Sequence, residues 1–71
     1  MHTVLVVDDD ADITALLTDY LRRFGFEALA AHDGASMRAQ MAQHSVDLLV
    51  LDLMLPGEDG ITLAREVRQR S

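Results

Sequence analysis

The sequence predicts an α/β fold in which parallel strands alternate with helices. Apolar runs rich in valine and leucine recur about every 22 residues, and each is followed by a segment with the apolar spacing of a helix. This βαβαβα order is typical of a three-layer structure, in which right-handed crossovers place helices on both faces of a parallel sheet. No internal repeat or low-complexity segment interrupts the pattern.

Length and composition exclude several classes of protein. A chain of 71 residues forms one domain at most, and its small core makes it marginally stable without a partner. The chain has 12 acidic residues and 6 basic ones, all arginine, and this negative net charge disfavours direct nucleic-acid binding. The lack of cysteine excludes disulfides and zinc–thiolate sites. The first apolar run is too short for a signal peptide or a membrane span, so we expect a cytoplasmic location.

The first βα unit starts with residues 3–7 (TVLVV), a β-branched run that fits a strand buried on both faces. The helix that follows can be capped by Asp10 or Asp12, and Gly25 suits the position just past its end. Its apolar residues form one stripe, as on a helix that packs against a core. These residues are Ile13, Leu16, Leu17, Tyr20, Leu21 and Phe24.

The second βα unit is the weaker one. Residues 26–31 (FEALAA) predict a strand, and Asp33 with Gly34 starts a helix. Met37 and Met41 share one side of that helix and are expected in the core.

The third βα unit starts with residues 46–51 (VDLLVL), a predicted strand. Pro56, Gly57 and Gly60 mark a loop, and a short helix ends near Gln69. The apolar stripe of this helix consists of Ile61, Leu63, Ala64 and Val67.

Acidic residues follow two of the predicted strands. Asp8, Asp9 and Asp10 come after the first strand, and Asp52 comes after the third. Sites in open parallel sheets form beyond the carboxyl ends of the strands, so these carboxylates converge if the two strands are neighbours. Their mutual repulsion would be relieved by a hard divalent cation such as Mg²⁺. A carboxylate beside that metal can also act as a nucleophile and form an aspartyl phosphate.

Two segments, VLVVDDDADI and LDLMLPGEDG, together resemble the receiver domain of two-component response regulators. The resemblance covers the whole chain, and DLMLPGEDG with GASM is similar to the OmpR-type branch, whose receivers precede a winged-helix DNA-binding domain. It implies a flavodoxin-like fold with strand order 2-1-3-4-5. Residues 1–71 would then be a truncated receiver domain, the first three βα units with strand order 2-1-3.

The resemblance also implies a role for each acidic residue. Asp52 matches the phospho-accepting aspartate, Asp9 the direct Mg²⁺ ligand, and Asp8 its acidic neighbour, which acts through metal-bound water. The backbone carbonyl of Met54 matches the third protein ligand to the metal. Asp10 is expected to be a helix cap rather than a ligand.

The implied function is that of a phospho-acceptor. Asp52 would take a phosphoryl group from a sensor histidine kinase with Mg²⁺, without enzymatic activity beyond this self-phosphotransfer. DNA would be bound only by a domain that this chain lacks. The family's hydroxyl residue after strand four and lysine after strand five have no match, and the chain has no lysine, so we expect impaired transfer.

Residues 46–51 form an internal strand in the family but would form a sheet edge in this chain. An open edge offers unpaired N–H and C=O groups to another strand. We therefore expect this strand to pair with a second copy of the chain, or segments to exchange between copies.

Two other functions stay open at the level of sequence. The chain could be an assembly fragment that keeps the acidic residues without phosphotransfer. The run VLVVDDD also fits a haloacid-dehalogenase-like phosphatase, although Asp12 and the absence of lysine depart from that family. Among the remaining polar residues, His2, His32 and His44 are expected in solvent, and Arg38 is expected to be exposed.

Overall fold

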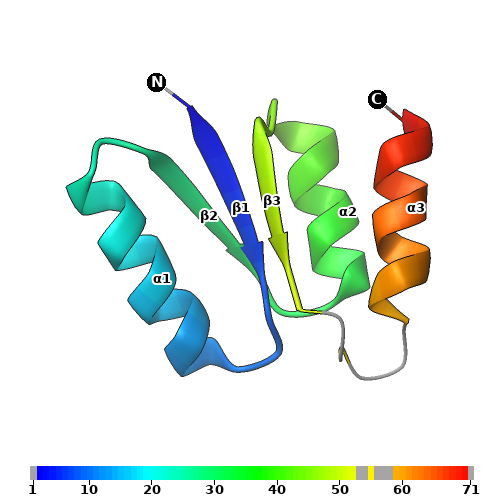
Figure 1. Ribbon diagram of the computed structural model, residues 1–71, viewed down its shortest axis with the longest axis horizontal. Helices are drawn as coiled ribbons and strands as arrows, with labels where there is room; N and C mark the ends of the chain where they lie inside the picture. Colours follow the sequence, from blue (N-terminus) through cyan, green and yellow to red (C-terminus); the bar gives the residue numbers. More distant parts are fainter. Residues whose placement is uncertain (1, 53–54, 56–58, 71) are drawn as a thin grey trace.

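The structure is a computed structural model that describes residues 2–52, 55 and 59–70. Its elements follow the predicted βαβαβα order (Figure 1). They are β1 (Thr3–Val7), α1 (Ala11–Arg23), β2 (Glu27–Ala31), α2 (Gly34–Gln43), β3 (Leu48–Leu51) and α3 (Gly60–Arg70). β2 starts one residue later than predicted, at 27 rather than 26, and β3 starts two residues later, at 48 rather than 46.

The three strands form one parallel sheet in the order β2-β1-β3, which confirms the predicted order 2-1-3. Val7, the last residue of β1, is level with Ala31 in β2 and with Leu51 in β3. The carboxyl ends of all three strands therefore meet at one edge of the sheet. The residues that follow these strands start from closely spaced backbone positions.

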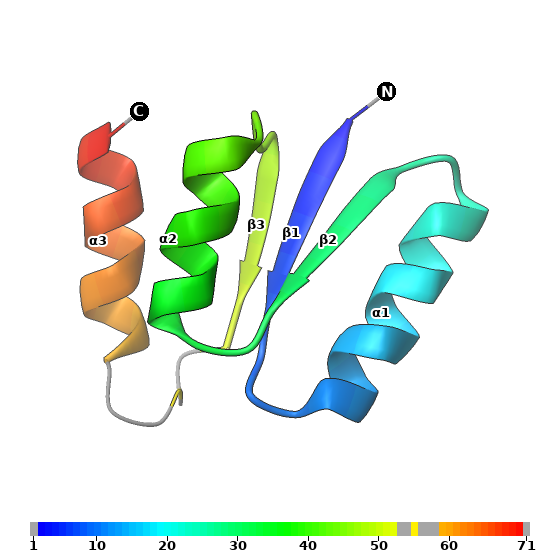
Figure 2. The same cartoon turned by 180° about the vertical axis from the view of Figure 1, so that it is seen from behind.

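The sheet lies between α1 on one side and the pair α2 and α3 on the other (Figures 1 and 2). Every residue of β1 is buried, as predicted for a strand covered on both faces. The main apolar cluster joins β1 to α2 and α3. It contains Leu5, Val7, Ala31, Met37, Leu55 and Leu63, with Met41 packed against it, so both methionines are core residues as predicted.

The apolar stripe predicted for α1 faces the sheet only in part: Leu17 and Leu21 are half-buried, but the other four residues are exposed. Leu16 is 70% exposed and Phe24 is 65% exposed, whereas Thr14 and Thr18 are buried. The threonines can be buried because their hydroxyls are satisfied within the helix; that of Thr18 donates to the carbonyl oxygen of Thr14 at 2.8 Å. The prediction was only partly right, because α1 packs on β2 and β1 with Thr14 and Thr18 buried and only part of the apolar stripe covered.

The predicted helix ends of α1 are confirmed. The Asp10 carboxylate caps the helix by accepting hydrogen bonds from the N–H groups of Asp12 and Ile13. Gly25 follows the last turn with φ at +87°, a left-handed conformation that a side chain would disfavour.

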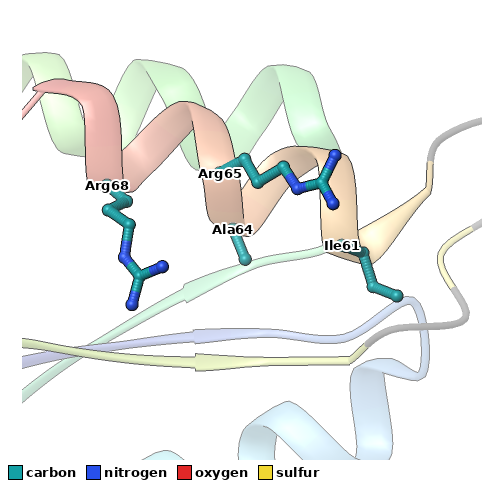
Figure 3. Close-up of a pocket in the computed structure, with 4 residues that line it drawn as sticks. All are labelled: Ile61, Ala64, Arg65 and Arg68. Atoms are coloured by element: carbon teal, nitrogen blue, oxygen red, sulfur yellow. The ribbon is translucent and has the colours of Figure 1, made fainter.

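The prediction of an apolar stripe on the buried side of α3 was only half right. Leu63 is buried and Val67 packs against the core, but Ile61 and Ala64 are exposed. With Arg65 and Arg68 they line an open hollow of about 370 Å³ (Figure 3). The lining residues that the structure describes all belong to α3, and none of the clustered acidic residues is among them.

The exposure predicted for Arg38 was also wrong. Its side chain is half-buried and forms an ion pair with Glu66 on α3. Among the helices that the structure describes, none has the length and apolar character needed to cross a membrane.

Candidate functional site

Three acidic side chains meet at the carboxyl edge of the sheet. Asp8 and Asp9 directly follow β1, and Asp52 directly follows β3. Each offers one carboxylate oxygen, and these oxygens all lie within 4.8 Å of one another. Asp8 and Asp52 are half-buried and Asp9 is exposed, so the cluster is open to solvent on one side. Met54, the other predicted ligand, lies outside the described residues.

Backbone hydrogen bonds fix the start of both acidic segments. The N–H of Asp8 donates to the carbonyl oxygen of Ala31 at 3.1 Å, and the N–H of Asp52 donates to that of Val7 at 2.9 Å. Asp8 and Asp52 are thus held by the ends of the parallel ladder itself. The backbone positions of Asp8 and Asp52 therefore follow from the strand order.

Asp8 and Asp10 belong to the same acidic segment, but their carboxylates accept different hydrogen bonds. One oxygen of Asp8, Oδ1, accepts a hydrogen bond from the N–H of Asp10 at 2.9 Å. Asp10 in turn uses its carboxylate to cap α1 and does not belong to the cluster of three. A consecutive run of three aspartates therefore supplies two members of the acidic cluster and one helix cap.

The cluster fits a hard divalent cation. Three carboxylates at this range repel one another when ionised, and a cation removes that cost. An all-oxygen donor set suits Mg²⁺, which uses one or two carboxylates and keeps several waters. The exposed side at Asp9 leaves room for those waters. The residues present therefore fit a magnesium site.

A comparison with known families agrees with this geometry. The family model described as "Response regulator receiver domain" matches residues 4–71. The chain belongs to this family. The match favours the receiver over the haloacid-dehalogenase-like alternative that the first strand allowed.

Curated relatives of this receiver are OmpR-type transcriptional regulators. The transcriptional regulatory protein CpxR of Klebsiella pneumoniae is 46% identical over 69 residues, which is 97% of this chain and 29% of CpxR. The chain thus spans less than a third of the length of this relative.

Solved structures show the same fold. The response regulator TrrA of Thermotoga maritima, solved in complex with Mg²⁺–BeF, is 34% identical with a TM-score of 0.92; the match covers 100% of this receiver and 62% of that chain. The complex of histidine kinase ThkA with TrrA gives 34% identity and a TM-score of 0.91, covering 100% of this receiver and 61% of that chain.

Sequence reasoning missed two polar contacts between residues that are far apart in the chain. Thr14 and His32 share a hydrogen bond of 3.0 Å between side chains 18 residues apart. At the other end of the sheet, the Asp47 carboxylate accepts the N–H of Thr3 at 2.8 Å. The burial of Thr14 and Thr18 exists only in the folded structure, so no sequence signal pointed to the first contact. No sequence signal pointed to the second.

Proposed function

We propose that this receiver accepts a phosphoryl group on Asp52, with Mg²⁺ held beside it by Asp8 and Asp9. The observation that carries the proposal is the approach of the three carboxylates to within 4.8 Å at the carboxyl edge of the sheet. The backbone carbonyl of Met54, outside the described residues, is proposed as the third protein ligand. Mg²⁺, when bound, neutralises charge on the transferring phosphoryl group and orients it.

The protein contributes the nucleophile and its alignment. A carboxylate oxygen of Asp52 forms the new O–P bond as the P–N bond to the donor histidine breaks, and the imidazole nitrogen keeps the electron pair. The backbone of Asp52 is fixed to β1, which limits the positions from which this oxygen can attack. Asp8 and Asp9 keep negative charge next to the nucleophile, where a cation can balance it.

The proposed donor is the phosphohistidine of a sensor histidine kinase in the cytoplasm. The solved complex of ThkA with TrrA supports this partner, because TrrA shares the fold of this receiver. The parent protein is proposed to be a winged-helix transcriptional regulator, and DNA binding would belong to that further domain. The length of CpxR, of which this chain covers 29%, leaves room for one.

We expect phosphotransfer to the 71-residue chain to be slow. The chain contains no lysine that could neutralise a phosphoryl oxygen. Asp52 and the metal ligands would then supply the chemistry without the full set of groups that hold the phosphoryl group. If so, the chain acts as a phospho-acceptor and not as an enzyme with turnover.

We also propose that the chain associates with a second copy through β3. The exposed side chains of Leu48 and Val50, at 57% and 42%, show that one face of this edge strand is uncovered. An edge strand with an apolar face is a ready template for another strand.

The test of phosphorylation is intact mass after incubation with acetyl phosphate and Mg²⁺. Wild-type protein should gain one phosphoryl group, and Asp52→Ala should gain none. Asp10→Ala is the matched control, since it removes an aspartate of the same segment that lies outside the cluster and should still be modified. A folded wild-type sample that gains no mass would contradict the proposal and favour a structural assembly fragment. An adduct that persists in Asp52→Ala would assign the acceptor to another residue.

A further inference from the structure

A side-chain hydrogen bond ties the connection between β2 and α2 to the first turn of α1. Nε2 of His32 lies 3.0 Å from the hydroxyl oxygen of Thr14. That hydroxyl donates its single proton to the carbonyl oxygen of Ala11 at 3.0 Å. With its proton directed to Ala11, the hydroxyl accepts a hydrogen bond from Nε2 of His32 in the tautomer that carries a proton there.

This bond closes a ring of hydrogen bonds around the first acidic segment. The N–H of Thr14 donates to the carbonyl oxygen of Asp10 at 3.1 Å. The N–H of Asp10 donates to Oδ1 of Asp8 at 2.9 Å. The N–H of Asp8 donates to the carbonyl oxygen of Ala31 at 3.1 Å, and Ala31 is followed by His32. The segment is thus held from both of its ends.

The ring of hydrogen bonds restrains an acidic segment whose carboxylates repel one another. Three carboxylates within 4.8 Å tend to move apart when no cation balances them. The segment that carries Asp8 and Asp9 follows β1 as a short connection with an exposed end. Restraining it lowers the cost of ordering the ligands when a cation binds.

We propose that His32 is a positioning residue for the metal site. Acting through Thr14, it holds Asp8 and Asp9 next to Asp52 and so sets the affinity for Mg²⁺. This inference rests on the proposed function, since it names a residue that controls the proposed metal site. His32 itself is exposed, whereas Thr14 is 2% exposed, so the imidazole restrains the segment from the protein surface.

The experiment measures the Mg²⁺ dissociation constant of the 71-residue chain by isothermal titration calorimetry. His32→Phe and Thr14→Val each remove the bond and should weaken binding about three- to tenfold. His32→Gln retains an N–H in the place of Nε2 and should bind within about twofold of wild type. The double variant His32→Phe with Thr14→Val should be no weaker than the weaker single variant, because both remove the same bond.

A second measurement separates positioning from a general loss of stability. Amide hydrogen exchange without metal should be faster at the N–H of Asp10 in His32→Phe than in wild type, while the far-UV circular dichroism stays the same. A variant that is merely less stable would keep the wild-type Mg²⁺ affinity in its folded fraction, and glutamine would not rescue it.

The outcomes for His32 and for the metal site are distinct. Wild-type Mg²⁺ affinity in His32→Phe, or unchanged exchange at Asp10, would overturn the role of His32 and leave the metal site intact. Failure of the wild-type chain to bind Mg²⁺ would overturn the metal site itself, and the proposed function with it.

Discussion

Arg38 and Glu66 join α2 to α3 through two contacts. Nε of Arg38 lies 2.8 Å from Oε2 of Glu66, and a terminal nitrogen of Arg38 lies 3.4 Å from Oε1. Both side chains are half-buried, with 36% and 34% of their surface exposed. Paired contacts of this kind are stronger than single ones and fix the relative orientation of the two groups. The pair therefore sets how α3 lies against α2 on that face of the sheet.

The first prediction is that Arg38→Ala lowers the free energy of unfolding by about 1 kcal/mol. The value is discounted because a third of each side chain is exposed and water screens the pair. The matched control is Arg23→Ala, which breaks an exposed pair with Asp19 on a single helix. That change should cost only about 0.3–0.5 kcal/mol. Urea denaturation of both variants measures the difference, and equal losses would show that the bond between α2 and α3 contributes no more than an exposed pair on one helix.

Metal binding gives the second prediction. If Mg²⁺ binds the folded chain only, as the proposed site requires, a hundredfold excess over its dissociation constant should stabilise the fold by about 2.7 kcal/mol. For a domain of this size that is a rise in Tm of roughly 11–22 °C. Asp9→Ala should abolish the rise, because Asp9 supplies one of the three clustered oxygens.

Asp19→Ala is the control for Asp9→Ala. It removes the same charge from an exposed position on α1, outside the cluster, and should leave the Mg²⁺ effect unchanged. Thermal unfolding with and without millimolar Mg²⁺ gives the comparison. A wild-type Tm that does not change with Mg²⁺ would contradict the proposed metal site.

The βαβαβα order could be predicted from local pattern, whereas the strand order 2-1-3, which brings Asp8 and Asp52 together, was implied by the resemblance to receiver domains. A run such as that of β1 is recognisable by its valines, and parallel strands must end at one edge, where Asp8 and Asp52 then meet. The side of α1 that faces the sheet could be predicted only in part. It depends on Thr14 and Thr18, whose hydroxyls find partners that only the folded helix provides.

Polar contacts between residues far apart in the chain could not be predicted from the sequence either. Arg38 and Glu66 are 28 residues apart, and Thr14 and His32 are 18 apart. Each pair joins two polar side chains that come into contact only when two elements pack together. Hydrophobic periodicity places the elements but carries no information about which polar side chains then come within reach.

The third prediction concerns pH and the start of α2. The N–H of Ser36 donates to the Asp33 carboxylate at 2.7 Å, and the Ser36 side chain bonds the N–H of Asp33 in return. The backbone hydrogen bond from Ser36, followed by that from its side chain, lowers the pKa of Asp33 below its ordinary value. A lowered pKa means that the cap stabilises the fold above the unfolded-state pKa of about 3.9 and loses this effect as pH falls through the folded-state pKa.

Asp33→Ala should therefore be less stable than wild type near neutral pH, and the difference should shrink as the pH is lowered below about 4. Asp33→Asn caps a helix without titrating, so its advantage over Asp33→Ala should not change with pH. Urea denaturation across this range gives both comparisons. A wild-type advantage over Asp33→Ala that grows on acidification would contradict the assignment.

The two edges of the sheet differ in how they are protected, which leads to the last prediction. On β2, Arg22 donates to the carbonyl oxygen of Ala28 at 2.8 Å and Gln40 donates to that of Ala30 at 3.4 Å. On β3 the N–H of Asp52 points to β1, so by alternation the polar groups of Leu51 point to the outer edge. Side chains thus occupy the edge of β2, whereas no such side-chain bond is found on β3 among the residues the structure describes.

Association of two copies should therefore depend on β3. Sedimentation velocity of the wild-type chain should show a dimer that grows with concentration in the micromolar range. Val50→Lys places a charge on the bare face of β3 and should shift the chain to monomer. Leu16→Lys removes a more exposed apolar side chain from α1 and should leave the dimer intact, which separates the edge strand from general surface hydrophobicity. A stable, folded wild-type monomer throughout this range would show that β3 tolerates its open edge in water.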